Sequence, residues 1–253
     1  MRALLLLTCA SLLFAQEHAP ATAPAIAHTG PAAATAPADL PDSPAAALAE
    51  LTAGNGRFVA GRRVRTVDTA HDAALRAALV KGQHPFAVIV TCSDSRVPDN
   101  LVFDQEAGRL FTIREAGNAP DLQGLASIEY AVEHLGSKVV VVMGHTGCGA
   151  VKAVREANGK PLPGNLWSLQ AGMAGLLAAT PPDPNEDEKA YGAHLEIENA
   201  RRQAQAVLDR SESVRRLAAL EKIWVLPALY HLDTGKVDLF KPLSATPAPQ
   251  AHP

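Results

Sequence analysis

Two uninterrupted apolar runs constrain what this chain can fold into more than any other feature. They are FAVIVT at residues 86–91 and KVVVVM at residues 138–143, and both are rich in β-branched side chains. A strand with one solvated face would alternate apolar and polar residues, whereas a strand covered on both faces of a parallel sheet need not. The runs therefore predict an α/β domain with a mostly parallel central β-sheet flanked by helices.

Weaker patterns supply the elements around these two runs. Further strands are expected at residues 110–114 and 223–229, with an edge strand at residues 236–240 after the turn LDTG. The spacing of apolar residues predicts helices over residues 45–59, 72–81, 122–135, 150–158 and 193–208. The segment PPDPNEDEK at residues 181–189 is acidic and rich in proline, which favours a solvated surface loop.

The N-terminal residues carry a targeting pattern rather than a fold pattern. Residues 1–15 read MRALLLLTCASLLFA, in which Arg2 precedes an apolar stretch and Ala15 marks a small-residue cleavage position. This pattern predicts a signal peptide, and its apolar stretch is too short to span a membrane. Lipidation at Cys9 is not expected, because Thr8 stands where a lipid-attachment signal has Gly or Ala.

The rest of the chain divides by composition. Residues 16–41 and residues 244–253 are rich in alanine and proline with few large side chains, which predicts a disordered tether and a disordered tail. Residues 42–243 remain as one domain of ordinary size. With the signal peptide, this organisation predicts an exported protein, most simply a periplasmic one.

Charge and hydropathy exclude two classes of partner. The formal net charge is −3 and no long basic run is present, which argues against binding to nucleic acid. No later apolar stretch is long enough to predict a membrane span.

Chemistry-bearing residues follow each of the two apolar runs. The first run ends at CSDSR, with Cys92, Asp94 and Arg96, and the second ends at GHTGCGA, with His145 and Cys148. The carboxyl ends of parallel strands meet at one edge of the sheet, which is where open α/β sheets place their sites. Two thiolates and one imidazole suit a zinc ion whose fourth position stays open. Three glycines of this segment, Gly144, Gly147 and Gly149, are expected to let the backbone turn so that both of its ligands face one ion.

Alternatives exist for these residues. An exported protein whose mature part holds only Cys92 and Cys148 would ordinarily be expected to join them in a disulfide. The nearby His145 and Asp94 favour the metal instead. Asp94 is either a turn-forming residue or an acceptor for the proton of a metal-bound water, and Arg96 is placed to keep it ionised.

The two motifs resemble those of the β-class carbonic anhydrases, Cys-x-Asp-x-Arg and His-x-x-Cys, and the resemblance runs from about Leu48 to Phe240. It implies one zinc ion per chain, held by the two cysteines and the histidine, and an Asp94–Arg96 dyad that orients the zinc-bound hydroxide. It also implies a substrate pocket like that of the plant-like branch. The residues at the matching positions of that pocket are Gln83, Phe111 and Tyr130, with the backbone N–H of Gly149.

The same resemblance implies reversible hydration of carbon dioxide to bicarbonate by attack of zinc hydroxide, in a homodimer or homotetramer. Ile89 stands where a bicarbonate-regulated branch has Trp, which implies an open site. Glu115 departs from the family, which usually has Asn there. Two other functions are left open, namely a hydrolase of carbonyl sulfide or carbon disulfide on the same scaffold and a non-catalytic binding module stabilised by zinc.

Overall fold

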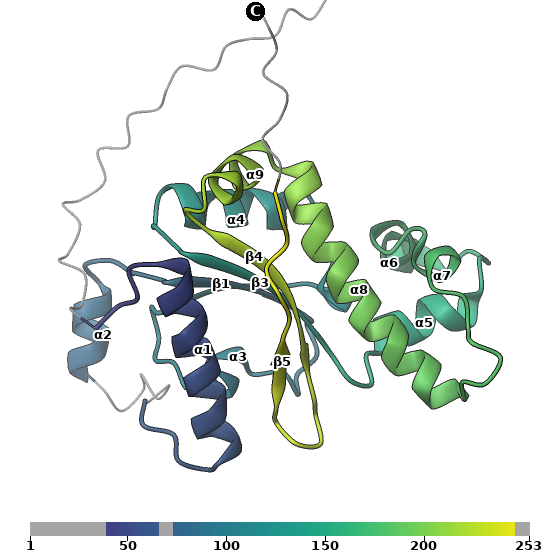
Figure 1. Ribbon diagram of the computed structural model, residues 1–253, viewed down its shortest axis with the longest axis horizontal. Coiled ribbons are helices and arrows are strands. Elements are labelled where there is room, and N and C mark those ends of the chain that lie inside the picture. The colour runs from purple at the N-terminus through teal and green to yellow at the C-terminus, as the bar shows by residue number, and fades with distance from the viewer. Residues whose placement is uncertain (1–38, 66–72, 246–253) are drawn as a thin grey trace, which may run out of the picture. The chain divides into compact units, whose positions relative to one another are not determined.

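A computed structural model describes residues 39–65 and 73–245 (Figure 1). Its strands are β1 (Ala87–Thr91), β2 (Leu110–Arg114), β3 (Val139–His145), β4 (Trp224–Tyr230) and β5 (Val237–Leu239). Its longer helices are α1 (Pro44–Val59), α4 (Leu122–Glu133), α5 (Gly149–Ala157), α8 (Glu188–Arg210) and α9 (Glu212–Ala219). Short helices complete it: α2 (Ala73–Leu79), α3 (Asp99–Val102), η1 (Ala116–Asn118), η2 (Gly164–Leu166), α6 (Trp167–Gly172) and α7 (Leu176–Ala179).

The five strands form one sheet in the order β2-β1-β3-β4-β5. The pairs β1–β2, β1–β3 and β3–β4 are parallel, and only β5 runs antiparallel to its neighbour β4. The predicted fold class, a mostly parallel central sheet with flanking helices, is confirmed. Because β1 and β3 are parallel neighbours, the two ligand segments that follow them leave the sheet at the same edge.

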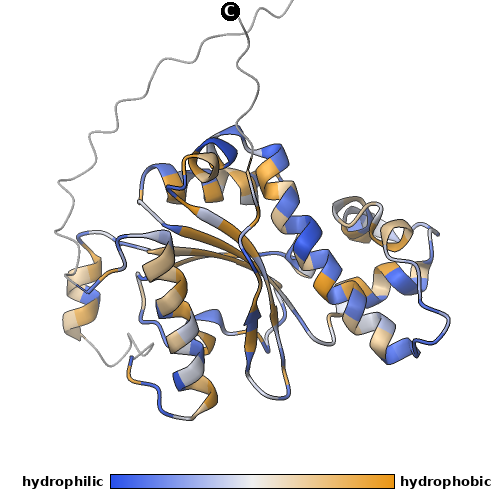
Figure 2. Cartoon of the chain, viewed as in Figure 1, coloured by the Kyte–Doolittle hydropathy of each residue, from blue (hydrophilic) through white to orange (hydrophobic). Residues whose placement is uncertain are grey.

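Each of the four parallel strands contributes residues to two cores, which explains the unbroken apolar runs. In β1, Ala87 and Ile89 belong to a core that also contains residues of α1, whereas Val88 and Val90 belong to a core with residues of α4, α8 and α9. All five residues of β1 and all seven of β3 are buried. Successive side chains of a strand point to opposite faces, so a strand covered on both faces can be apolar throughout. Figure 2 shows the central strands as a continuous hydrophobic band.

The structure differs from the sequence prediction mainly among the helices. Helix α8 starts at Glu188 rather than residue 193, because Asp187 caps it by accepting a hydrogen bond from the N–H of Ala190 over 2.8 Å. The acidic loop is shorter for the same reason. Helix α9 was not expected, although Ser211 caps it by accepting from the N–H of Val214. The short helices α3, α6 and α7 have too few residues to show a period in the sequence.

Packing against the domain reaches back into the segment predicted as a tether. Asp39 accepts hydrogen bonds from Arg109 over 3.1 Å, and Leu40 packs against the core beneath α1. Those two residues are therefore ordered rather than part of a loose tether. At the other end, Ala245 packs against the second core. The predicted signal peptide and the greater part of the predicted tether and tail lie outside the described residues. Across residues 39–65 and 73–245, no helix combines the length and the hydropathy needed to cross a bilayer.

Candidate metal centre

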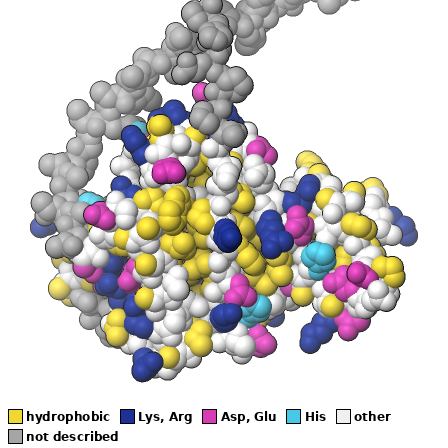
Figure 3. Space-filling model, viewed as in Figure 1, with side chains coloured by type: hydrophobic (Ala, Val, Ile, Leu, Met, Phe, Trp, Pro, Cys, Tyr) yellow, Lys and Arg dark blue, Asp and Glu magenta, His cyan; other side chains and the backbone are white. Residues whose placement is uncertain are grey.

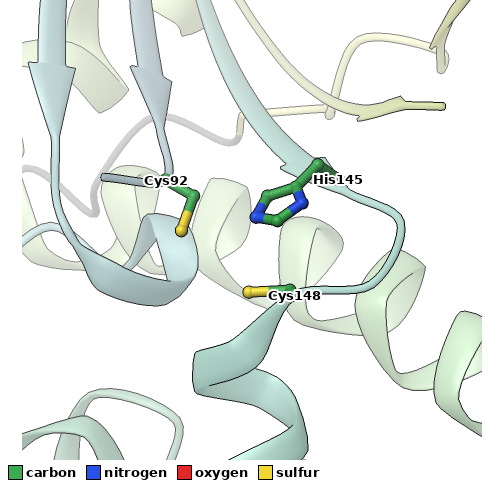
Figure 4. A group of neighbouring side chains, drawn as sticks. All are labelled: Cys92, His145 and Cys148. Atoms are coloured by element: carbon green, nitrogen blue, oxygen red, sulfur yellow. The ribbon is translucent and has the colours of Figure 1, made fainter. Parts of the chain in front are cut away.

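Three side chains converge at the carboxyl edge of the sheet (Figure 4). Cys92 directly follows β1, His145 is the last residue of β3, and Cys148 is the N-cap of α5. All three are buried, and their donor atoms lie within 4.8 Å of one another. The structure therefore brings together the three residues predicted as metal ligands.

The imidazole of His145 is oriented by the backbone carbonyl of the next residue, Thr146. Its Nδ1 lies 3.0 Å from the carbonyl oxygen of Thr146, which makes Nδ1 the protonated nitrogen. Its Nε2 is buried and has no hydrogen-bond partner among the described residues. A buried nitrogen with a free lone pair, aimed at two sulfurs, fits a metal ligand better than a core histidine.

The two sulfurs share a proton when no metal binds them. Cys92 and Cys148 are free thiols, so the structure contradicts a disulfide between them. A hydrogen bond from the Cys148 thiol lowers the pKa of Cys92 to about 4, and the N–H of Gly117 also donates to its sulfur over 3.4 Å. The same bond between the sulfurs, together with burial, raises the pKa of the Cys148 thiol. A cation in place of that proton would satisfy both sulfurs, and a buried Cys₂His set with an open fourth position fits zinc.

Asp94 and Arg96 form a tight pair beside the three donors. Nε and Nη2 of Arg96 donate to the two oxygens of Asp94 over 2.9 and 2.7 Å, and the backbone N–H of Arg96 donates to Oδ1 over 2.9 Å. These bonds hold the pKa of the Asp94 carboxyl well below its ordinary value. Oδ2 of Asp94 lies 3.8 Å from Nε2 of His145, so this oxygen faces the donors while Arg96 anchors the carboxylate.

Gly149 follows the ligand Cys148 directly, but the other residues predicted to line the substrate pocket, Gln83, Phe111 and Tyr130, do not join this group. Gln83 precedes β1, so a whole strand of roughly 17 Å separates it from Cys92 at the other end. Phe111 pairs in register with Val88 near the start of β1 and packs against the second core. Its ring lies 6.5 Å from that of Tyr130, which is 46% exposed.

Of the three glycines, only Gly147 plays the part expected of it. Gly147 has a φ of +69°, so it makes the turn that only glycine adopts readily. Gly144 lies inside β3, where a Cβ would come within 3.2 Å of the carbonyl oxygen of Glu196. Gly149 starts α5 directly after Cys148 and needs no special conformation.

Glu196 is the residue at this centre that the sequence prediction missed. Its side chain is 8% exposed, and its Oε1 accepts a hydrogen bond from the backbone N–H of Cys148 over 2.8 Å. A signal for it exists, because Glu196 lies at helical spacing from Ala200, Gln203 and Val207, all of them buried. An acidic residue on the buried stripe of a helix indicates a specific hydrogen-bond partner.

Comparison with known proteins places this arrangement in a known group. Residues 87–237 match the family model described as carbonic anhydrase. Carbonic anhydrase 2 of Mycobacterium tuberculosis is 47% identical over 115 residues, 45% of this chain and 54% of that protein. The chain thus spans about half the length of that relative. The carbonic anhydrase of Mycolicibacterium smegmatis is 33% identical over 203 residues, 75% of this chain and 89% of that protein.

Solved structures give the same result. The β-carbonic anhydrase CafA of Aspergillus fumigatus matches with a TM-score of 0.62 and 26% identity, over 78% of this chain and 90% of that one. One of two β-carbonic anhydrases of Sordaria macrospora, described as tetrameric, matches with a TM-score of 0.53 and 25% identity, over 68% of this chain and 88% of that one.

Proposed function

This chain belongs to the β-class carbonic anhydrase family, and on that premise we propose that it catalyses the reversible hydration of carbon dioxide to bicarbonate and a proton. The observation that carries the proposal is the buried group of two sulfurs and one unpartnered imidazole nitrogen beside the Asp94–Arg96 pair. A purely structural metal site would have no use for an ionised carboxylate held next to the open position.

Cys92, His145 and Cys148 would hold one zinc ion. Zinc supplies a Lewis acid that makes water acidic enough to serve as the nucleophile near neutral pH. Two thiolates donate more charge than neutral ligands, so we expect activity to be favoured at mildly alkaline pH.

Asp94 would orient the nucleophile rather than bind the metal. Arg96 donates to both oxygens of Asp94 and so keeps the carboxylate ionised and fixed. The ionised Oδ2, which faces the donor group, can accept a hydrogen bond from the attacking hydroxyl and leave its lone pair aimed at the substrate.

A second copy of the chain would complete the substrate pocket. Gln83, Phe111 and Tyr130 lie away from the metal donors of their own chain, and Tyr130 is open to contact. Figure 3 shows apolar side chains gathered between α1 and α8, a surface that further association could cover. The relative described as tetrameric supports the same expectation.

The decisive assay is stopped-flow hydration of carbon dioxide on the zinc-loaded protein, with bound zinc quantified on the same sample. Asp94→Asn should keep its zinc and lose activity by about 10²- to 10⁴-fold. Asp121→Asn is the matched control, because Asp121 caps α4 and asparagine caps a helix equally well. A wild-type protein with full zinc and no hydration at alkaline pH would overturn the proposal.

Mixing two inactive variants tests the shared pocket. Cys92→Ala lacks the metal site and Gln83→Ala lacks the pocket residue. If the partner supplies Gln83, random reassortment should restore about a quarter of the wild-type activity, since half the dimers are mixed and each has one intact site. Absence of any recovery, with mixed dimers demonstrated, would place Gln83 outside the partner's site.

Neither alternative function gains support from these observations. A carbonyl sulfide or carbon disulfide hydrolase would share the ligands, and those substrates become the next assay if hydration fails. A non-catalytic zinc module would leave Asp94→Asn without consequence.

Export to a periplasm is part of the same proposal. It rests on the apolar stretch after Arg2 and on Ala15. Cell fractionation with N-terminal sequencing of the recovered protein tests it. A mature protein that starts near residue 16 in the periplasmic fraction is expected, and full-length protein confined to the cytosol would reject it.

A further inference from the structure

We infer that Glu196 is a positioning residue, which holds the turn between His145 and Cys148 in its metal-binding shape before a metal ion arrives. The inference rests on the proposed function only in taking this turn to be a metal-binding one. It assigns a role to a side chain that neither binds the metal nor reaches the Asp94–Arg96 pair.

The contact itself is short and buried. The backbone N–H of Cys148 donates to Oε1 of Glu196 over 2.8 Å, and the N–H of Gly147 also points at this carboxylate. The side chain comes from α8, far along the chain from the turn. A buried carboxylate that receives two successive backbone N–H groups fixes the orientation of both peptide units.

The approach of α8 to β3 makes this contact possible. Gly144 has no side chain at the point where the backbone of Glu196 passes, and a Cβ there would sit 3.2 Å from the Glu196 carbonyl oxygen. A larger residue at position 144 would hold the helix away and withdraw the carboxylate. The glycine before His145 thus serves the position of Glu196 rather than the flexibility of the turn.

The other groups of the turn have separate anchors. The N–H of Thr146 donates to the carbonyl oxygen of Tyr230 over 3.0 Å, and its hydroxyl accepts from the N–H of Leu232. The carbonyl oxygen of Gly147 accepts from Arg96 over 3.3 Å. Glu196 is therefore the anchor for the remaining N–H groups of the turn, including that of the ligand Cys148.

Cys148 has a particular need for this help. It occupies the N-cap of α5, yet its own side chain makes no capping hydrogen bond. In a capping box, Glu or Gln at the third helical position accepts from the N–H of the N-cap residue, but Val151 stands at that position here. Glu196 supplies an acceptor from another helix, on the side of α5 where negative charge is favourable.

A cleft borders this contact, so a change in the shape of the turn can be distinguished from a loss of folding stability. A cleft of about 850 Å³ is lined by Gly147, Cys148, Glu196 and Glu188. If Glu196 is shortened, water can enter and satisfy the exposed N–H groups. Water does not hold these N–H groups in one direction. Shortening Glu196 should therefore disturb the shape of the turn more than it lowers the free energy of unfolding.

The test compares Glu196→Ala, which removes the acceptor, with Glu196→Gln, which keeps one oxygen. Glu188→Ala is the matched control, because Glu188 is on the same helix and lines the same cleft but pairs with Arg155 instead of the turn. Zinc release to a chelator should be about 10- to 100-fold faster in Glu196→Ala, intermediate in Glu196→Gln and unchanged in Glu188→Ala. The absorption spectrum of the cobalt-substituted protein should shift in the same order.

Release from Glu196→Ala within about twofold of Glu188→Ala, with an unshifted cobalt spectrum, would overturn the inference. Should the Glu196 variants fail to fold, amide hydrogen exchange of the zinc-free wild-type protein decides instead. A protected Cys148 N–H without metal supports a preformed turn, and an unprotected one overturns it. A wild-type protein that binds no zinc defeats the proposed function, and the exchange measurement still answers for Glu196.

Discussion

Two groups of polar side chains among the described residues are built on opposite principles. The metal centre (Cys92, His145 and Cys148) directs three electron-pair donors toward one another. The ion network around α1 (Asp39, Arg57, Arg65, Asp104 and Arg109) sets carboxylates against guanidinium groups, and of these Asp104 and Arg109 are buried. Complementary charges in the network identify a scaffold, whereas donors that converge on one another identify a metal site.

Removing a ligand should produce the largest effect. In Cys92→Ala the remaining sulfur and imidazole cannot hold zinc tightly, so bound zinc and hydration should both fall by more than about 100-fold, beyond the usual cost of losing an outer-shell partner. Zinc analysis and the hydration rate on one preparation check this. Stoichiometric zinc in the variant would show that Cys92 is not a metal ligand, and the contrast between the metal centre and the ion network would no longer hold.

Removing a charge from the network should cost stability and leave zinc in place. The side chain of Asp104 is fully buried and accepts hydrogen bonds from Arg57 and from the N–H groups of Val64 and Arg65. Asp104→Asn should lower the free energy of unfolding by about 3 kcal/mol, because it leaves Arg57 without its buried partner. Asparagine tolerates the left-handed backbone at this position, where φ is +48°, so strain does not confound the result.

Urea unfolding measures this change, and zinc content is the second readout. A variant that loses zinc in proportion to its stability would show that the two groups are coupled.

Acid should reduce the stability that the ion network contributes, because it protonates Asp104. Burial alone would raise the pKa of Asp104, but hydrogen bonds from Arg57, Val64 and Arg65 outweigh it and lower that pKa below its ordinary value. A lowered pKa in the folded state adds stability above the unfolded value near 4, and this stability is lost as the pH falls through the folded value. The difference in unfolding free energy between wild type and Asp104→Asn should therefore shrink below about pH 4. A difference that stays constant down to acid unfolding would exclude Asp104 as the titrating group.

The smallest expected effect on stability comes from an ion pair at the surface. Asp238 accepts from Lys236 over 2.6 Å and lies 2.8 Å from Nε2 of His231, but it is 38% exposed. Water and salt screen such a pair, so Asp238→Asn should cost less than about 1 kcal/mol. The same urea experiment, repeated at high salt, should reduce the cost further. A loss as large as that of Asp104→Asn would mean that burial does not separate these ion pairs.

The elements that could be predicted from the sequence are those whose signal is local. An unbroken apolar run predicts a strand covered on both faces. The residues that follow two such strands lie at the same edge of the sheet, because neighbouring parallel strands end at that edge. This reasoning led to β1, β3 and the grouping of Cys92, His145 and Cys148. The short helices and the extension of α8 escaped it, because capping residues and single turns leave little periodic pattern.

Residues that act across long separations were harder to foresee. Glu196 contacts Cys148 only because α8 packs against β3. The residues next to Glu196 in the sequence do not indicate that Cys148 is its hydrogen-bond partner. The places of Gln83, Phe111 and Tyr130 in a pocket followed from resemblance alone, and one chain does not bring them to the metal centre. If a second copy completes the pocket, as we propose, then contacts within one chain could not have placed these three residues there.

The placement of the ligands on β1 and β3 also orders events in time. These strands are neighbours in the sheet, but the chain between them must first complete a crossover through β2 and α4. Such parallel pairing closes a long loop and is slow, so the ligand set does not exist until most of the topology does. Zinc should therefore bind a nearly finished fold, and its presence should slow unfolding far more than it speeds folding.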